Sequence, residues 1–369
     1  MPETSRARRL GYALNAFPYH TLAELWPVLE QDVLAIKARC FPTEPFPIEL
    51  RFSAPIVQEL QTDRAAVAKL KAFLATNDLH LVTVNAFVLS RFHGERVKEH
   101  VYLPAWHESD ERKNFTCASI DLLTQLAVAA VGNRGDPRLA SAATDFVSAS
   151  VPFGALKPVT MAQIAPNILA CAEHARQLHQ RTGIRCVVAL EPEPGLTVET
   201  TGEVLEFFRA HVPEKLRSYL GVNFDLSHQL VEFEDLTASV RAIQDAGILL
   251  AKIHVTCAAE LPELKPFYED SIYLHQTTGA DATGQRKFFS LDWPTQFPPG
   301  LTTYRVHYHL PVFPSELPST LRQVEQFLTG PLPDCPLIIE TYTWPQQLRG
   351  RDRLVDNICR EIEWVRSKI

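Results

Sequence analysis

The stretch CVVALE at residues 186–191 is a short apolar run that ends on a carboxylate. Two similar runs follow it, GVNFD (221–225) and LLAKIH (249–254), and longer stretches separate the three runs. Strand-like runs that alternate with longer helical stretches are typical of βα units, whose strands form a parallel sheet. This part of the chain therefore predicts an alternating β/α fold.

The same pattern extends over the rest of the chain. Six further runs fit it: LGYALN (10–15), IELRFS (48–53), LVTVNA (81–86), TDFVSAS (144–150), YRVHYH (304–309) and LIIE (337–340). Nine strands are one more than a (β/α)8 barrel uses, so one run lies outside the barrel. The surplus run is either 144–150, which is weakly apolar, or 304–309, which follows a long irregular stretch.

The alternative fold is a doubly wound open sheet. Its usual sign is a Gly-rich phosphate loop after the first strand, and LNAFPYH (14–20) has none. We therefore expect residues 1–369 to form a single TIM-barrel domain. Helix starts are predicted by four capping-box spacings: Thr21-x-x-Glu24, Thr160-x-x-Gln163, Thr200-x-x-Glu203 and Thr320-x-x-Gln323.

The composition excludes several classes of protein. The chain has 36 Lys and Arg against 43 Asp and Glu, a net charge of −7, whereas a nucleic-acid-binding protein normally carries a basic excess. No window approaches the ~18 uncharged apolar residues of a membrane-spanning helix, and the N-terminus lacks the apolar region of a secretory signal. Seven scattered cysteines without a C-x-x-C pair indicate neither a disulfide framework nor a zinc ribbon. We expect a cytoplasmic protein whose partner is a small-molecule substrate; nothing in the sequence indicates its oligomeric state.

Polar residues occupy the last inward position of four predicted strands. In a β/α barrel, catalytic residues lie at the carboxyl ends of the strands, and alternate side chains point into the barrel mouth. This alternation points four side chains inward: Glu191, Asp225, His254 and Glu340. Three converging carboxylates would repel one another without a cation, and a divalent ion would neutralise them. The sequence therefore predicts a site for Mn²⁺, Zn²⁺, Co²⁺ or Mg²⁺, since these ions suit oxygen ligands with one imidazole.

The set Glu191, Asp225-Leu-Ser-His228, His254 and Glu340 resembles the xylose-isomerase-like TIM-barrel superfamily of sugar isomerases, ketose 3-epimerases and endonuclease-IV-type enzymes. The chain as a whole also resembles the EboE-type metabolite-traffic proteins of the bacterial ebo cluster. Three segments carry this second resemblance: RFHGERVKEHVYLPAW (91–106), YRVHYHLPVF (304–313) and IIETYTW (338–344).

The resemblance to the superfamily implies roles for these residues. Glu191, Asp225, His254 and Glu340 would be the ligands of one divalent ion, and His228 would hydrogen-bond the substrate or bind a second ion. In the epimerases the two glutamates also exchange a proton on opposite faces of a substrate carbon, so Glu191 and Glu340 would be catalytic. A C–H beside a carbonyl needs such help, because it is a weak acid unless a cation holds the developing negative charge.

Two more histidines raise the question of further ions. His307 and His309 share one face of a strand, so together with His228 they could hold a second ion, as the matching segment does in the endonuclease-IV-like branch. That branch has an aspartate where this chain has His307, and the alternative is that the two histidines bind an anionic substrate or pack beneath a lid. His93 is a further candidate ligand, so the sequence allows one ion, or two or three.

Substrate contacts are predicted from the same alternation of side chains. It points five polar residues toward the mouth: Asn15, Arg51, Asn85, Lys252 and Arg305. The three cations among them would grip a phosphate or carboxylate, or would instead form an internal ion-pair layer with inward glutamates. Connections 86–110 and 256–301 are long enough to form a lid, and they contain aromatic residues: Trp106, Phe267, Tyr268, Phe288, Phe289 and Trp293.

Three functions compete on this basis. The first is a metal-dependent isomerase or epimerase that acts on a small hydroxylated or phosphorylated metabolite, in a pathway for a secondary-metabolite precursor. The second is a multi-metal phosphodiesterase of the endonuclease-IV type, although the acidic net charge disfavours DNA as its substrate. The third is a non-catalytic metabolite-binding protein, which the resemblance to the EboE type favours. We expect an enzyme rather than a carrier.

Overall fold

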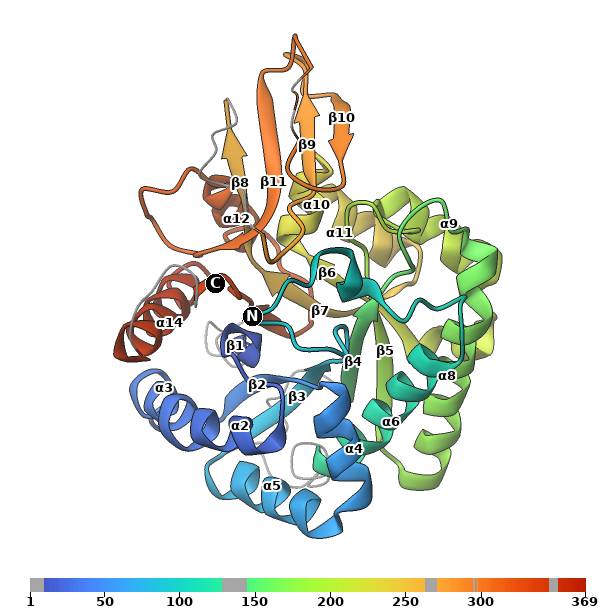
Figure 1. Cartoon of the computed structure of the whole chain (residues 1–369), viewed down its shortest axis with the longest axis vertical. Helices are drawn as coiled ribbons and strands as arrows, with labels where there is room; N and C mark the ends of the chain where they lie inside the picture. Colours follow the sequence, from blue (N-terminus) through green and yellow to red (C-terminus); the bar gives the residue numbers. More distant parts are fainter. Residues whose placement is uncertain (1–9, 128–144, 263–270, 295, 297, 345–350) are drawn as a thin grey trace.

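The computed structural model describes residues 10–127, 145–262, 271–294, 296, 298–344 and 351–369. Eight parallel strands form a closed barrel, which confirms the predicted (β/α)8 fold (Figure 1). Their order around the barrel is β1 (Leu10–Ala13), β12 (Leu337–Ile339), β7 (Leu249–Val255), β6 (Leu220–Asp225), β5 (Arg185–Glu191), β4 (Phe146–Pro152), β3 (Leu79–Asn85) and β2 (Phe46–Arg51).

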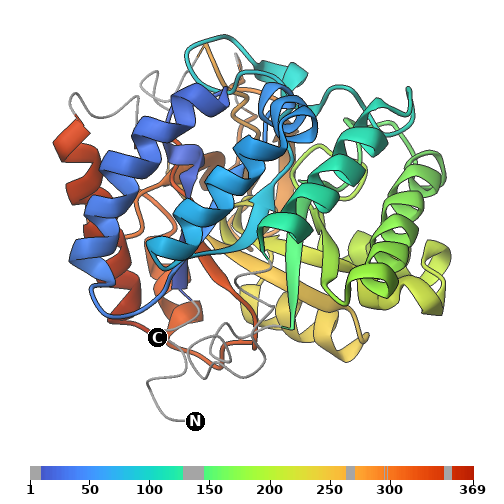
Figure 2. The same cartoon turned by 90° about the horizontal axis from the view of Figure 1, so that it is seen from below.

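Helices surround the strands, as Figure 2 shows from a second direction. They are α2 (Leu22–Pro27), α3 (Leu34–Cys40), α4 (Ala54–Thr62), α5 (Arg64–Thr76), α6 (Glu111–Leu126), α8 (Met161–Thr182), α9 (Thr201–His211), α10 (Leu226–Val231), α11 (Leu236–Asp245), α12 (Leu321–Leu328) and α14 (Arg351–Arg366). The capping boxes predicted at Thr21, Thr160 and Thr200 are confirmed. The one at Thr320 is wrong, because this hydroxyl bonds the backbone of Ala258 in a neighbouring strand instead.

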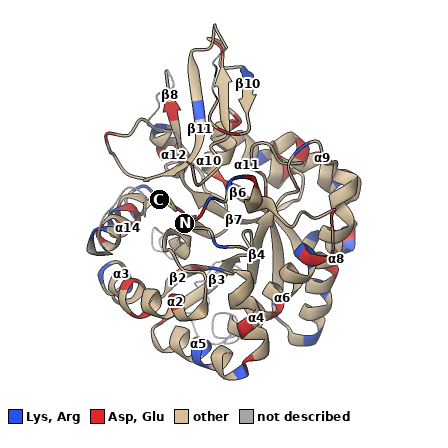
Figure 3. Cartoon of the chain, in the orientation of Figure 1, with Lys and Arg blue, Asp and Glu red and all other residues tan. Residues whose placement is uncertain are grey.

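The main hydrophobic core lies between the barrel and its helices. Outward side chains of the strands, such as Leu190 and Val222, pack there against apolar helix residues such as Ile168. Charged side chains of both signs are interspersed along the outer helices (Figure 3). Among the helices that the structure describes, none is long and apolar enough to cross a membrane. All seven cysteines are free thiols.

A second, antiparallel sheet is inserted between β7 and β12. It has the strand order β10 (Arg286–Ser290), β9 (Thr277–Ala280), β11 (Thr303–Leu310) and β8 (Cys257–Leu261). The chain enters it directly from the end of β7, and Figure 1 shows it standing beside the barrel. The surplus run is therefore 304–309, and 144–150 belongs to the barrel. The stretch before 304 is less irregular than the sequence indicates, since three of these short strands fall within 256–301.

An apolar roof covers the mouth of the barrel. We use this name for the cluster of Phe87, Val88, Phe92, Val97, Tyr102, Leu196, Tyr273, Leu274 and Tyr342. Both predicted lid connections contribute to it, and the backbone N–H groups of Val97 and Lys98 donate to the carbonyl of Ile272. Trp106 lies elsewhere: it is fully buried and donates to the carbonyl of Pro152. Phe267 and Tyr268 fall outside the described residues.

Candidate metal centre

Four polar side chains meet at the carboxyl ends of four neighbouring strands, β12, β7, β6 and β5. We call Glu191, Asp225, His254 and Glu340 the carboxylate group; each offers one ligand atom, and these atoms all lie within 4.8 Å of one another. The Nδ1 atom of His254 is central, at 3.1 Å from Glu191 Oε1, 3.0 Å from Glu340 Oε2 and 3.5 Å from Asp225 Oδ2. The pairing of Asp225 with His254 across β6 and β7 holds these two at one level.

Neutral donors hold one oxygen of each carboxylate and leave the other facing the centre. Ser150 donates to Glu191 Oε2 at 3.0 Å, and the Asn15 amide donates to Glu340 Oε1. Asp225 Oδ1 accepts from Thr256 and from the first turn of α10, whereas its fully buried Oδ2 has no hydrogen-bond partner. A buried carboxylate oxygen without a partner is costly, so this atom fits a cation at the centre.

The pKa shifts in the carboxylate group also indicate that a positive charge is required at its centre. Burial opposes a charge on His254, but Glu340, Glu49 and Glu191 raise its pKa well above the usual value. Burial likewise opposes a charge on Glu340, but the facing His254 lowers its pKa well below the usual range. In the absence of metal, a proton on His254 therefore supplies the positive charge that the carboxylates require.

The other ring nitrogen of His254 faces a residue that the sequence analysis did not single out. His254 Nε2 lies 3.3 Å from Glu49 Oε2, and the same oxygen accepts from Lys252 Nζ. A carboxylate that holds the far N–H of a metal-ligating histidine fixes the ring and keeps its other nitrogen available. Lys252 thus belongs to an internal ion pair and does not line the cavity. Glu49 and Arg51 are two positions apart on β2 and share one face of the strand, so the inward direction predicted for Arg51 also predicts an inward Glu49.

Replacement of Glu49 by glutamine is expected to lower divalent-metal affinity about 10- to 100-fold, because His254 loses its orienting carboxylate. Metal titration with a fluorescent competitor chelator measures this effect. The double variant Glu49→Gln/Lys252→Met is the control, since it also removes the lysine that would be left uncompensated. Its stability should recover while its metal affinity stays low; full recovery of affinity would assign Glu49 a purely structural role.

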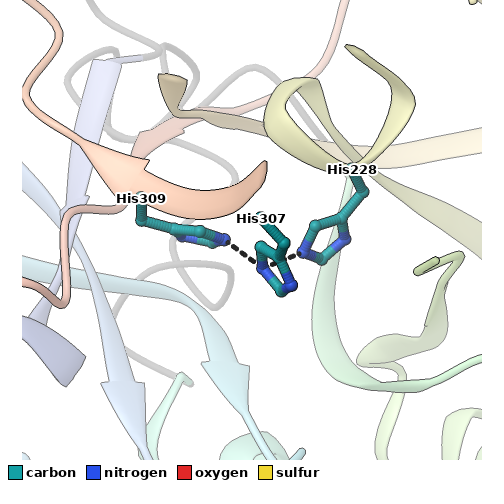
Figure 4. A group of neighbouring side chains, drawn as sticks. All are labelled: His228, His307 and His309. Carbon is teal, nitrogen blue, oxygen red and sulfur yellow. Dashed lines mark hydrogen bonds between the residues drawn. The ribbon is translucent and has the colours of Figure 1, made fainter. Parts of the chain in front are cut away.

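Three histidines form a second cluster beside the first. His228 lies in α10, just after β6, and His307 and His309 lie on β11 of the inserted sheet. We call them the histidine group (Figure 4). His307 Nε2 lies 3.0 Å from His228 Nε2 and 3.1 Å from His309 Nε2. All three rings are buried.

Hydrogen bonds on the far side of the rings fix which nitrogens carry protons. His228 Nδ1 lies 3.0 Å from the carbonyl of Pro192, and His307 Nδ1 lies 2.7 Å from Gln276 Oε1. Both oxygens are acceptors, so each Nδ1 donates and each neutral ring turns a bare Nε2 toward the other. Two lone pairs 3.0 Å apart repel unless they share a proton or a metal ion. The donor set therefore fits a cation, and three imidazoles are a ligand set that suits zinc.

The two groups adjoin each other. His309 Nδ1 lies 3.1 Å from Glu340 Oε2, and His309 Nε2 lies 3.8 Å from Asp225 Oδ2. His228 Nδ1 lies 4.0 Å from Glu191 Oε1. Carboxylates of the first group thus lie close enough to the histidine group to be shared between the two.

The structure does not bring every predicted residue to the centre. Both ring nitrogens of His93 are engaged, by the carbonyl of Asn15 and the hydroxyl of Tyr273, and burial lowers its pKa to about 4. Arg305 bonds Glu260 and the carbonyl of Leu230 and does not line the cavity. Asn15, Arg51 and Asn85 do line it.

Sequence reasoning also missed polar residues that line the cavity. Glu193 accepts from Tyr102 and Gln276, and burial raises its pKa. Glu193 follows Glu191 by two residues in EPEP, a spacing that could have flagged it. Gln276 lies in the connection 256–301, where no strand is predicted, so the alternation of side chains gives no direction for it.

The cavity above both groups has a volume of about 70 Å³. Its floor is polar, with Glu191, Glu340 and the histidine group, and its upper wall is the apolar roof. An apolar wall above a few converging polar groups is typical of a small-molecule site, and the roof limits the access of water to it.

Comparisons with known proteins agree with the fold. No protein-family model matches the chain, and no curated protein sequence matches it. Among solved structures, a xylose isomerase-like TIM barrel protein from Mycobacterium smegmatis in complex with magnesium is 13% identical, with a TM-score of 0.52 over 99% of this chain and 98% of that chain. An IOLI protein with a bound zinc atom is 11% identical, with a TM-score of 0.51 over 98% of each chain. The chain thus has the xylose isomerase-like TIM-barrel fold.

Proposed function

We propose that the protein is a divalent-metal-dependent enzyme of the isomerase or epimerase type, acting on a small hydroxylated or phosphorylated metabolite. The observation that supports this most is the meeting of the carboxylate and histidine groups at one small cavity, beside a buried Asp225 Oδ2 that has no hydrogen-bond partner. Mn²⁺, Zn²⁺, Co²⁺ or Mg²⁺ would be held by the carboxylate group, and Zn²⁺ by the histidine group.

The residues around the cavity would have distinct roles in this reaction. Bound divalent ions would polarise the carbonyl and neighbouring hydroxyl of the substrate. Glu191 and Glu340 come from different strands on either side of His254, so each would move a proton at one face of the substrate carbon. Ser150 and Asn15 keep these carboxylates oriented, and the apolar roof excludes water that would quench a carbanion.

The histidine group favours a second candidate, a phosphodiesterase with two or three metal ions. Adjoining metal sites can stabilise both the attacking and the leaving oxygen of a phosphoester. The small cavity and the net charge of −7 favour a small phosphodiester over DNA. A third candidate keeps the same centre for recognition alone, as the EboE-like segments suggest for a protein that moves a precursor.

Metal analysis and isotope exchange test the proposal together. Protein purified without chelator is expected to contain about two divalent ions per chain by elemental analysis. In D₂O, the metal-loaded enzyme should exchange carbon-bound hydrogen in members of a panel of ketoses and ketose phosphates, as followed by NMR. Protein without metal would contradict all three candidates. Hydrolysis of bis(p-nitrophenyl) phosphate without carbon exchange would select the second candidate, and ligand binding without either reaction would select the third.

A further inference from the structure

The barrel mouth is divided into two halves. The carboxylate group comes from four strands that are consecutive around the barrel, β12, β7, β6 and β5. The cavity residues Arg51 and Asn85 lie at the ends of β2 and β3, in the opposite arc. β2 and β6 stand four positions apart in an eight-stranded ring, so Arg51 faces the Asp225 side of the metal centre across the mouth.

Arg51 is the exceptional residue of this second half. It is 1% exposed, and one terminal N–H group donates to the carbonyl of Tyr19. Its Nε and Nη1 groups have no hydrogen-bond partner, although the side chain lines the cavity. Within the described part of the chain, no carboxylate lies within ion-pair distance of the guanidinium, and burial lowers its pKa.

The other cations that the sequence offered for this role already have partners. Lys252 is paired with Glu49, and Arg305 with Glu260. Lys98 also lines the cavity, but its ammonium lies 2.6 Å from Asp292. A buried cation that is left uncompensated is costly, whereas an anion placed against it restores both its charge balance and its hydrogen bonds.

We infer that Arg51 is the anion contact of the substrate, so that the substrate carries a phosphate or carboxylate group at the end remote from the metal centre. This inference rests on the proposed function, because it assigns the second half of the same cavity. An anion oxygen that accepts from an unpartnered N–H group of this guanidinium forms a charge-assisted hydrogen bond and balances the buried charge. Binding an anion at one end fixes the distance from that end to the metal centre, which selects the length of the substrate.

Anion binding to metal-free protein tests the inference without involving the metal. The chain is dialysed against chelator and titrated with inorganic phosphate, followed by ³¹P NMR, and separately with acetate, followed by calorimetry. Wild-type protein should bind one of these anions saturably at millimolar concentration, and the preferred one identifies the substrate group. Arg51→Gln should weaken this binding about tenfold or more, which corresponds to the loss of a charge-assisted contact. The matched control Arg305→Gln should leave it unchanged.

Two further measurements distinguish a loss of anion binding from a folding defect in the variant. The bound anion should raise the melting temperature of the wild type but not that of Arg51→Gln. Arg51→Lys keeps the positive charge but loses the planar guanidinium, so its anion affinity should fall between those of the wild type and Arg51→Gln. Arg51→Lys replaces the glutamine variant in the test if that variant does not fold. Equal anion affinity in wild type and Arg51→Gln, or no saturable binding of either anion to the wild type, overturns the inference. Metal content of the same proteins, measured after reloading, reports on the proposed function independently.

Discussion

Replacement of Asp225 by asparagine is expected to lower divalent-metal affinity of the carboxylate group by more than about 100-fold, beyond the effect of changing an outer residue. The substitution keeps Oδ1, which accepts from Thr256 and from the backbone of His228 at the start of α10. It replaces the buried, unpartnered Oδ2 by an amide nitrogen that cannot bind a cation. The substitution is therefore expected to reduce metal binding while keeping the hydrogen bonds that Oδ1 accepts.

Elemental analysis and competitor-chelator titration measure the affinity, and thermal unfolding of metal-free protein measures the structural cost. Burial opposes a charge on Asp225, but His228 and His309 lower its pKa below the usual range, so this charge stabilises the folded chain. The metal-free variant should therefore unfold at the wild-type temperature or modestly below it. Asp235→Asn is the matched control, since Asp235 caps α11 through the same kind of hydrogen bond and lies at the surface. Wild-type metal affinity in Asp225→Asn would remove the carboxylate group from consideration as a metal site.

Replacement of His307 by asparagine is expected to remove one of two metal ions and to loosen the inserted sheet. His228 belongs to α10, whereas His307 and His309 belong to β11, so an ion in the histidine group would link the inserted sheet to the helix that follows β6. An ion at about 1,000 times its dissociation constant stabilises the folded chain by about 4 kcal/mol, and the variant should lose this contribution.

Elemental analysis should show the metal content of His307→Asn fall from two ions per chain to one. Hydrogen exchange should become faster in β8, β9 and β11, while β5 and β6 keep their wild-type protection. His275→Asn is the control, because His275 contacts the carbonyl of His307 and stacks on Tyr308 but is not part of the histidine group. Two ions in His307→Asn, or equal zinc-induced stabilisation in both variants, would show that these histidines hold no metal.

The order of apolar runs was sufficient to predict the barrel, because each βα unit forms from contacts close in sequence. It was not sufficient to identify the inserted sheet. The strand 277–280 is short and contains Thr and Gly, so it has little apolar character of its own, and pairing with β11 is what makes it a strand.

The alternation of side chains along four strands pointed Glu191, Asp225, His254 and Glu340 inward, and strand geometry alone is enough for that, since it depends on neighbours in sequence. This alternation could not predict which of the three cations forms an ion pair. Arg51, Lys252 and Arg305 look alike in the sequence, and only partners some 45 to 203 residues away distinguish the two paired ones from Arg51. The same holds for the histidine group, whose members meet because β11 of the inserted sheet packs against α10. Local periodicity thus predicted the inward direction of the carboxylate group, and the closure of the chain in three dimensions decided which polar side chains line the cavity and which of them find a partner.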